Sequence, residues 1–425
     1  MSTQGDFHSL PGPQDITRRE LANGLVLLSR ANFNSPSVVI SGNLPVGGLS
    51  DPDARLGLAE FTAQSLLRGT QRYSFQQLYD SLESVGASLS FSGGTHSTSF
   101  GGTALVEDLD LLLDILAQAI QQPTFPVEQV ERLRTQFLTA LAIRAQDTAH
   151  MASMAFDRLV YAGHPYSRPE DGYPETIQAI SQPDLVDFQR RGYGPRGAVI
   201  ALVGAIEPLL AVEKIEQALG GWQNPGQLAT PELPPLQPLA GVITDKVIIP
   251  GKSQADLVIG AAGPSRKSGD YLAASLGNNI LGQFGMMGRI GEAVREKAGL
   301  AYYADSSLGG GLGPGPWCVS AGIDPANSQR ATSLVLAEIQ HFVSQPVTVD
   351  ELADSVAHYI GRLPLSLESN AGVASALLAL ERYDLGLDYY QRYPGLVRSV
   401  TREDILAAAW RYLNPDRLGI ALAGP

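Results

Sequence analysis

The chain has 425 residues, enough for two or more domains that each bury their own core. Its 43 acidic and 30 basic residues give a formal net charge of -13, which argues against nucleic acid as a partner because phosphate binding needs clustered Lys and Arg. No apolar run reaches the roughly 18 residues of a membrane span, and the N-terminus shows neither a basic start nor an apolar stretch. Composition therefore predicts a cytoplasmic protein without a membrane partner.

The segment from Gly57 to Thr70 has the frame of a zinc-binding helix but lacks the ligands. An inverted zinc motif, H-x-x-E-H, places two histidines four residues apart on one helical face with a carboxylate beside them. Here Glu60 and Gln64 stand at the histidine positions, and Ala63 stands where the carboxylate would activate water. A neutral amide is a poor zinc donor, and a methyl group is no general base. The segment therefore predicts a helix that cannot hold zinc.

Nothing else in the sequence replaces these donors. No two of the six histidines stand three or four residues apart, so each is interpreted as an isolated surface or core residue. The single cysteine, Cys318, can form neither a thiolate cluster nor a disulfide within the chain, and we expect it to lie buried in a strand. The sequence thus predicts no metal cofactor in this chain.

Apolar patterning predicts strands and helices in both halves. Strands are expected at Val38–Gly42 and Asp256–Gly260, and helices at Val106–Ile120 and Ala331–Val343. In the last of these helices the apolar residues recur at helical spacing, which is typical of a face that packs on the core. Strands mixed with long helices indicate an α+β class, with helices covering a mostly antiparallel sheet.

A repeat with an offset of about 220 residues divides the chain into two homologous domains. The segments 180–204 and 400–424 both read as a capped helix, a Pro turn and a buried strand, with Asp184 matching Asp404 and Tyr193 matching Tyr412. Between the halves, the Pro-rich stretch 224–240 favours an extended spacer. We therefore expect domains at 1–223 and 241–425, joined by this linker.

Two segments carry a resemblance to a known family. Gly57, Phe61, Gly69 and Thr70 keep a pattern close to G-x-x-H-F-x-E-H-x-x-x-x-G-T, and the stretch 288–307 is similar to S-R-L-x-x-x-V-R-E-K-x-G-L-A-Y-x-V. Both patterns belong to the pitrilysin or insulinase-type zinc metallopeptidases, which include mitochondrial processing peptidase. The match extends over essentially the whole chain. In that family, two such domains face each other like a clamshell.

The resemblance also implies what is missing. In the family a third zinc ligand, a glutamate, falls within the stretch that here reads Thr139-Ala140-Leu141, so Ala140 stands at or next to its place. With Glu60, Ala63 and Gln64 also departing from the pattern, the whole metal site is degenerate. The resemblance therefore implies a member without zinc chemistry of its own.

In the second domain the resemblance implies a retained peptide-binding pair. Arg295 and Tyr302 match an arginine and a tyrosine that hydrogen-bond the backbone of bound peptide in family members. A guanidinium fork and a phenol are directional donors for peptide carbonyls. The alternative is that Arg295 pairs with a neighbouring glutamate and Tyr302 packs on the core. The glycine-rich stretch 281–288 takes the place of a glycine-rich loop in the noncatalytic subunit of mitochondrial processing peptidase, or is a plain turn.

These observations lead to one functional hypothesis with two rivals. The chain is expected to be the noncatalytic, substrate-binding subunit of a heterodimeric zinc-dependent processing peptidase, with zinc and an intact H-x-x-E-H in the partner chain and a peptide as substrate. Alone, it is expected to show no proteolysis. The alternatives are a structural scaffold, like the core proteins of respiratory complexes in the same superfamily, or a stand-alone peptide-binding clamshell.

Overall fold

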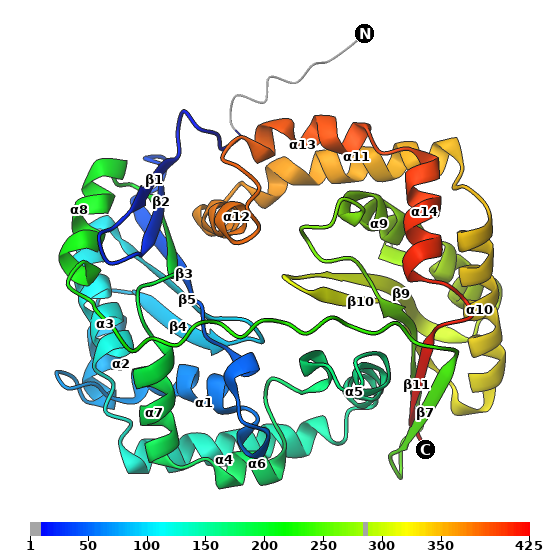
Figure 1. Cartoon of the computed structure of the whole chain (residues 1–425), viewed down its shortest axis with the longest axis horizontal. Helices are drawn as coiled ribbons and strands as arrows, with labels where there is room; N and C mark the ends of the chain where they lie inside the picture. The colour runs from blue at the N-terminus through cyan, green and yellow to red at the C-terminus, as the bar shows by residue number, and fades with distance from the viewer. Residues whose placement is uncertain (1–9, 284–287) are drawn as a thin grey trace. The chain divides into compact units, whose positions relative to one another are not determined.

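The computed structural model describes residues 10–283 and 288–425, which form two compact units, each with its own sheet (Figure 1). Neither unit is continuous in sequence. Of the described residues, unit 1 contains 10–140, 169–232 and 363–392. Unit 2 contains 141–168, 233–283, 288–362 and 393–425.

Unit 1 is built on a six-stranded sheet in the order β1-β2-β6-β3-β5-β4. Only the β2–β6 pair is parallel, so the sheet is mostly antiparallel, as predicted. The strands are β1 (Thr17–Glu20), β2 (Val26–Ala31), β3 (Ser37–Leu44), β4 (Ser88–Gly93), β5 (Thr98–Leu105) and β6 (Val199–Gly204). Strand β4 alternates exposed and buried side chains, and it is an edge strand of the sheet that the described residues form.

Helices cover both faces of this sheet. Helix α12 packs against β2, β3 and β6, while α3 and α8 lie on the other side of the sheet in Figure 1. Helix α1 packs against the edge strand β4. The helices of unit 1 are α1 (Leu58–Ser65), α2 (Phe75–Ser84), α3 (Leu109–Gln121), α4 (Val127–Arg144, which ends in unit 2), α6 (Pro174–Ala179), α7 (Gln182–Gly192), α8 (Pro208–Leu219) and α12 (Asn370–Arg382).

Unit 2 repeats this arrangement with five strands in the order β7-β11-β8-β10-β9. Again only one pair, β7–β11, is parallel. The strands are β7 (Ile243–Ile248), β8 (Ala255–Ala262), β9 (Ala301–Gly310), β10 (Pro314–Ile323) and β11 (Gly419–Gly424). The helices are α5 (Thr148–Val160), α9 (Tyr271–Asn278), η8 (Gly291–Lys297), α10 (Ser328–Ser344), α11 (Val349–Ser366, which ends in unit 1), α13 (Tyr389–Arg398, which begins in unit 1) and α14 (Arg402–Tyr412).

Both faces of the second sheet are buried, because alternate residues of its strands enter two different cores. Leu257 and Ile259 of β8 pack into the cluster formed with α9, α10 and α14. Val258, between them, packs with Phe156 of α5 on the other face. Cys318 lies in that second cluster, 7% exposed, which confirms the expected buried strand position.

The predicted duplication is confirmed by topology. Strand β6 lies between a parallel β2 and an antiparallel β3, just as β11 lies between a parallel β7 and an antiparallel β8. The helices that precede them start alike: the backbone N–H of Ser181 donates to Asp184 at 2.7 Å, and that of Thr401 donates to Asp404 at 2.9 Å. Both edge strands, β4 and β9, also follow a glycine at φ 65°, Gly86 and Gly299.

The units differ from the continuous ranges 1–223 and 241–425 because each half of the chain contributes a helix to the other unit. Helix α5 from the first half covers the second sheet, and α12 from the second half covers the first. The linker 224–240 contains no helix or strand, as expected, but both of its ends are held. Gln227 exchanges hydrogen bonds of 3.1 and 2.9 Å with the backbone of Arg196, and Leu236 packs on the α5 cluster.

Two further details concern helices. The expected helix Val106–Ile120 begins at Leu109, because Val106–Asp108 form a separate 3-10 turn. Among the residues that the structure covers, no single helix is long and apolar enough to cross a membrane, and only the broken pair α11 and α12 meets that test together.

Candidate functional site

Helix α1 carries the positions that would hold zinc in the family pattern. The helix begins after Gly57, whose φ of 92° favours glycine, and a Cβ there would lie 2.7 Å from Ile177. The buried carboxylate of Asp51 accepts hydrogen bonds from the backbone N–H groups of Gly57 and Ala59, both at 2.9 Å. These contacts fix the start of the helix, so Glu60 and Gln64 lie one turn apart on the same face.

Glu60 is already occupied by contacts within unit 1. One carboxylate oxygen accepts hydrogen bonds from the backbone N–H of Gly93 and, at 3.4 Å, from the hydroxyl of Ser92. The other oxygen accepts a hydrogen bond from the amide of Gln64. Burial raises the pKa of Glu60 above its usual value, although these three hydrogen bonds oppose the shift. The carboxylate therefore joins α1 to the edge strand β4.

The remaining ligand positions offer no donor atom. Ala63 is fully buried and Ala140 is exposed on α4. Helices α1 and α4 are in contact, since the ring centroid of Phe61 lies 5.1 Å from that of Phe137, one turn before Ala140. Within residues 10–283 and 288–425, no group of three or more His, Cys, Asp or Glu side chains could hold a metal ion. This donor set does not fit zinc.

Arg295 and Tyr302 lie on either side of a helix end. Arg295 belongs to the helical segment η8, which stops before Gly299, and Tyr302 is the second residue of the edge strand β9. The Arg295 side chain is 40% exposed, with its Nε 3.7 Å from the carboxylate of Glu296. Tyr302 is 56% exposed, so it does not cap the core. Half of the glycine-rich stretch, residues 284–287, lies outside the described residues.

A buried hydrogen-bond network, which sequence reasoning missed, lies behind Tyr302. Asp256 of β8 is 1% exposed, and one of its oxygens accepts a hydrogen bond from the Tyr303 hydroxyl at 2.6 Å. Its other oxygen accepts from the Thr148 hydroxyl and, at 2.9 Å, from the Gln254 amide. The same amide nitrogen donates to the Tyr302 hydroxyl. A lone aspartate in an otherwise apolar strand was the signal for this network, because a buried carboxylate needs donors.

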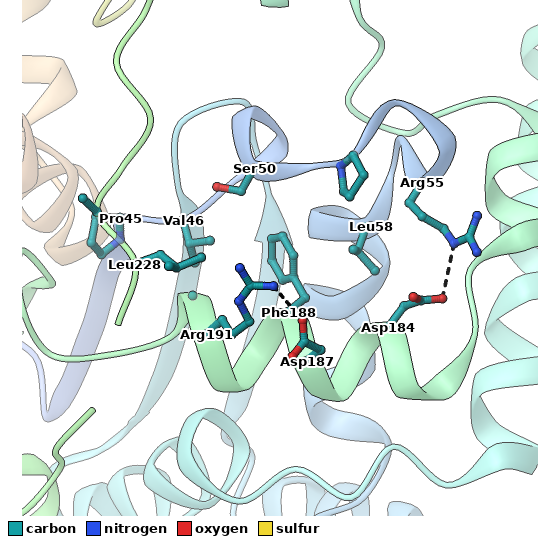
Figure 2. Close-up of a pocket in the computed structure, with 13 residues that line it drawn as sticks. Pro45, Val46, Ser50, Arg55, Leu58, Asp184, Asp187, Phe188, Arg191 and Leu228 are labelled. Carbon is teal, nitrogen blue, oxygen red and sulfur yellow. Dashed lines mark hydrogen bonds and ion pairs between the residues drawn. The ribbon is translucent and has the colours of Figure 1, made fainter. Parts of the chain in front are cut away.

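Unit 1 also contains a separate cavity of about 240 Å³ between α7 and the turn that precedes α1 (Figure 2). Its floor is apolar, with Val46, Leu58 and Phe188 among the lining residues. The charged residues at its rim pair with each other, Arg55 with Asp184 at 3.3 Å and Arg191 with Asp187 at 3.1 Å. Because these charges are compensated and none of the predicted site residues line it, we assign this cavity no part in the site.

The fold has two homologous units of sheet and helices, and helix α1 has the frame of a zinc-binding helix without a complete set of zinc ligands. These features define a protein of the two-domain metallopeptidase class. Comparison with known families agrees: residues 26–169 match the insulinase family, peptidase family M16, and residues 179–358 match the peptidase M16 inactive domain. The chain belongs to the insulinase-type M16 peptidase family. Its ligand positions make it a noncatalytic member of that family.

The relatives include proteins named as proteases. The chain is 24% identical over 416 residues to an uncharacterized zinc protease of Streptomyces coelicolor, covering 96% of this chain and 90% of that protein. The crystal structure of a peptidase M16 inactive domain from Pseudomonas fluorescens has a TM-score of 0.90 at 26% identity, covering 97% of this chain and 98% of that one.

Shorter matches connect the chain to subunits of larger assemblies. It is 24% identical over 269 residues to the bovine mitochondrial cytochrome b-c1 complex subunit 1, covering 62% of this chain and 55% of that protein. It is 23% identical over 210 residues to a probable mitochondrial-processing peptidase subunit beta of Arabidopsis thaliana, covering 49% of this chain and 39% of that protein.

Proposed function

We propose that the chain is the noncatalytic, substrate-binding subunit of a heterodimeric zinc-dependent processing peptidase. One observation carries this proposal: the zinc helix has no donor set, while Arg295 and Tyr302 keep exposed donors next to an edge strand. The partner chain would supply zinc on an intact H-x-x-E-H. The similarity to a probable mitochondrial-processing peptidase subunit supports a role in such an assembly.

The edge strand suggests how peptide would be held. Among residues 10–283 and 288–425, β10 is the one strand that pairs with β9, so the other side of β9 can pair with an extended peptide through main-chain hydrogen bonds. The Tyr302 phenol and the Arg295 guanidinium would then donate to carbonyl oxygens of that peptide. Recognition of this kind depends on the backbone, so it tolerates many side chains.

The test is to isolate the tagged chain from its native host and to identify what co-purifies. We expect a chain of similar size with an intact H-x-x-E-H, and peptide cleavage that a chelator abolishes. Replacing Arg295→Ala or Tyr302→Phe should lower turnover by the complex while its assembly stays intact. Chelator-sensitive cleavage by this chain alone would contradict the proposal.

A scaffold role is the second candidate, and two observations favour it. The chain resembles the cytochrome b-c1 complex subunit 1 over 62% of its length, and Tyr302 already contacts Gln254. In that case the Arg295 and Tyr302 substitutions leave turnover by any co-purified peptidase unchanged. A stand-alone peptide-binding protein would also bind peptide, but it would form a homodimer and no peptidase chain would co-purify with it. The cytoplasmic location stays a prediction under each of these readings.

A further inference from the structure

The Tyr302 hydroxyl forms a hydrogen bond with the side-chain amide of Gln254, and the surroundings of Gln254 determine which of the two groups donates. Gln254 immediately precedes β8, and its amide nitrogen contacts both the Tyr302 oxygen and a carboxylate oxygen of Asp256. A glutamine amide could in principle face either partner with its oxygen or its nitrogen. The contact with Asp256 determines that the nitrogen, and not the oxygen, of the Gln254 amide faces both partners.

Carboxylate oxygens accept hydrogen bonds, and both oxygens of Asp256 already accept one, from the hydroxyls of Tyr303 and Thr148. Gln254 therefore presents its NH₂ group to Asp256, at 2.9 Å, and the second hydrogen of that group is available for the Tyr302 oxygen. Tyr302 is the acceptor in this contact. A phenol carries a single hydrogen, so the hydrogen of Tyr302 is free to point away from Gln254.

The network behind Gln254 is itself firmly held. Asp256 is 1% exposed and also accepts hydrogen bonds from the hydroxyls of Thr148 and Tyr303. Thr148 belongs to α5, the helix that the first half of the chain contributes to unit 2. The Tyr302 ring packs edge-on against Tyr303 with 5.1 Å between ring centroids. The position of the Gln254 amide is thus fixed by buried groups rather than by solvent.

We propose that Gln254 is a positioning residue that makes Tyr302 a hydrogen-bond donor toward the carbonyl of a bound peptide. This inference rests on the proposed function, since it concerns the same peptide site. It assigns Gln254 an effect on binding that acts only through the Tyr302 hydroxyl. A purely structural role for Gln254 would not depend on that hydroxyl.

The experiment compares the full-length chain with Gln254→Leu, Tyr302→Phe and the double variant. Binding is followed by the fluorescence anisotropy of a labelled peptide of Thr-Lys-Thr-Val repeats, which is extended and basic and so suits an acidic chain. Tyr390→Phe is the matched control: it also removes a hydroxyl that donates to a backbone carbonyl, that of Ala376 at 3.2 Å, in unit 1 and outside the Asp256 network. Melting temperatures identify variants that misfold.

We expect each single variant to weaken peptide binding by about three- to tenfold, the value of one hydrogen bond. The double variant should bind no more weakly than Tyr302→Phe alone, because Gln254 has no effect once the hydroxyl is gone. The control should bind peptide as the unmodified chain does.

A second readout needs no peptide. The hydrogen bond from Gln254 lowers the pKa of Tyr302, against the upward effect of burial. Gln254→Leu should therefore raise the pKa of Tyr302, as measured by ultraviolet difference titration with Tyr302→Phe as the blank. An unchanged Tyr302 pKa would overturn the inference.

The outcomes separate the two proposals. If Tyr302→Phe weakens binding and Gln254→Leu does not, or if the double variant loses the sum of both effects, the inference fails and the proposed function stands. If Tyr302→Phe leaves binding unchanged, or the unmodified chain shows no saturable binding, the proposed function fails and the inference fails with it.

Discussion

The carboxylate of Glu60 accepts a hydrogen bond from the backbone N–H of Gly93, so a residue at a zinc-ligand position connects helix α1 to the edge strand β4. The contact spans 33 residues of sequence. Gln64, at the other ligand position, donates to the same carboxylate. The two positions that would bind metal in an active relative thus form a local polar contact within unit 1.

This contact predicts a pH dependence. Because burial raises the folded-state pKa of Glu60, the folded chain binds the proton more tightly than the unfolded chain does. The resulting contribution to stability is present at acidic pH and is lost as the pH rises through the raised pKa. The free energy of unfolding of the unmodified chain, relative to Glu60→Gln, should therefore decrease as the pH rises, as urea unfolding would measure. The same substitution at the exposed Glu83 is the control, and a pH-independent difference for Glu60 would contradict the prediction.

Restoring the donors should restore metal binding. The combined changes Glu60→His, Gln64→His and Ala140→Glu supply two imidazoles one helical turn apart and a carboxylate on the neighbouring helix α4. We expect this variant to retain zinc through gel filtration, and the unmodified chain to retain none, by elemental analysis. Ala140→Gln in place of Ala140→Glu should weaken retention. Tight zinc binding by the unmodified chain would show that the helix is not degenerate.

The ion pair between Arg289 and Glu351 should stabilise unit 2. Two hydrogen bonds of 2.7 and 2.8 Å join them, and the Arg289 side chain is 13% exposed. The guanidinium lowers the pKa of Glu351 to about 2, so this stability is present above the ordinary carboxyl pKa and is lost as the pH falls toward 2. Glu351→Gln should cost about 1–2 kcal/mol at neutral pH, measured by urea unfolding, and less at acidic pH.

The exposed pair of Arg392 and Asp388 is a suitable control. Its side chains are 48% and 47% exposed, so Asp388→Asn should cost less than about 0.5 kcal/mol. If Glu351→Gln and Asp388→Asn lowered the free energy of unfolding equally, the burial of Arg289 would add nothing to the stability that its ion pair contributes.

Gly322 on β10 should be sensitive to any side chain. A Cβ there would lie 2.4 Å from Cζ of Tyr302 and 2.5 Å from a ring carbon of Tyr303. Gly322→Ala should therefore displace both rings, at a cost of about 1–3 kcal/mol, and should lower peptide binding if Tyr302 takes part. Gly361→Ala on α11 is the counterpart: nothing lies within 4 Å, so it should stabilise the chain by about 0.5–1 kcal/mol. Thermal unfolding measures both, and an unaffected Gly322→Ala variant would contradict the packing described here.

Several features could be predicted from sequence because they are local. The capped helices before β6 and β11 follow from Ser181 and Thr401, each followed three residues later by an aspartate. The core face of α10 follows from apolar residues at helical spacing. The first expected helix began three residues later than predicted, because a 3-10 turn precedes Leu109. Helix ends depend on such turns more than on apolar pattern.

The exchange of α5 and α12 between the units had no sequence signal. Each helix has an apolar face that would suit either sheet, and pattern alone does not say which sheet it covers. The contacts of Gln254 were also unpredictable. Gln254 and Tyr302 are 48 residues apart, and they meet only because β8 and β9 both pair with β10.

The sequence by itself determined the duplication, the α+β class and the lack of a complete zinc donor set at Glu60, Ala63 and Gln64, because these depend on residue type and on spacing within one helix or strand. Only the tertiary structure decided that Glu60 contacts Gly93 and that Gln254 contacts Tyr302. Such pairs are set by strand register and helix packing, which bring distant residues together according to the fold of the whole unit.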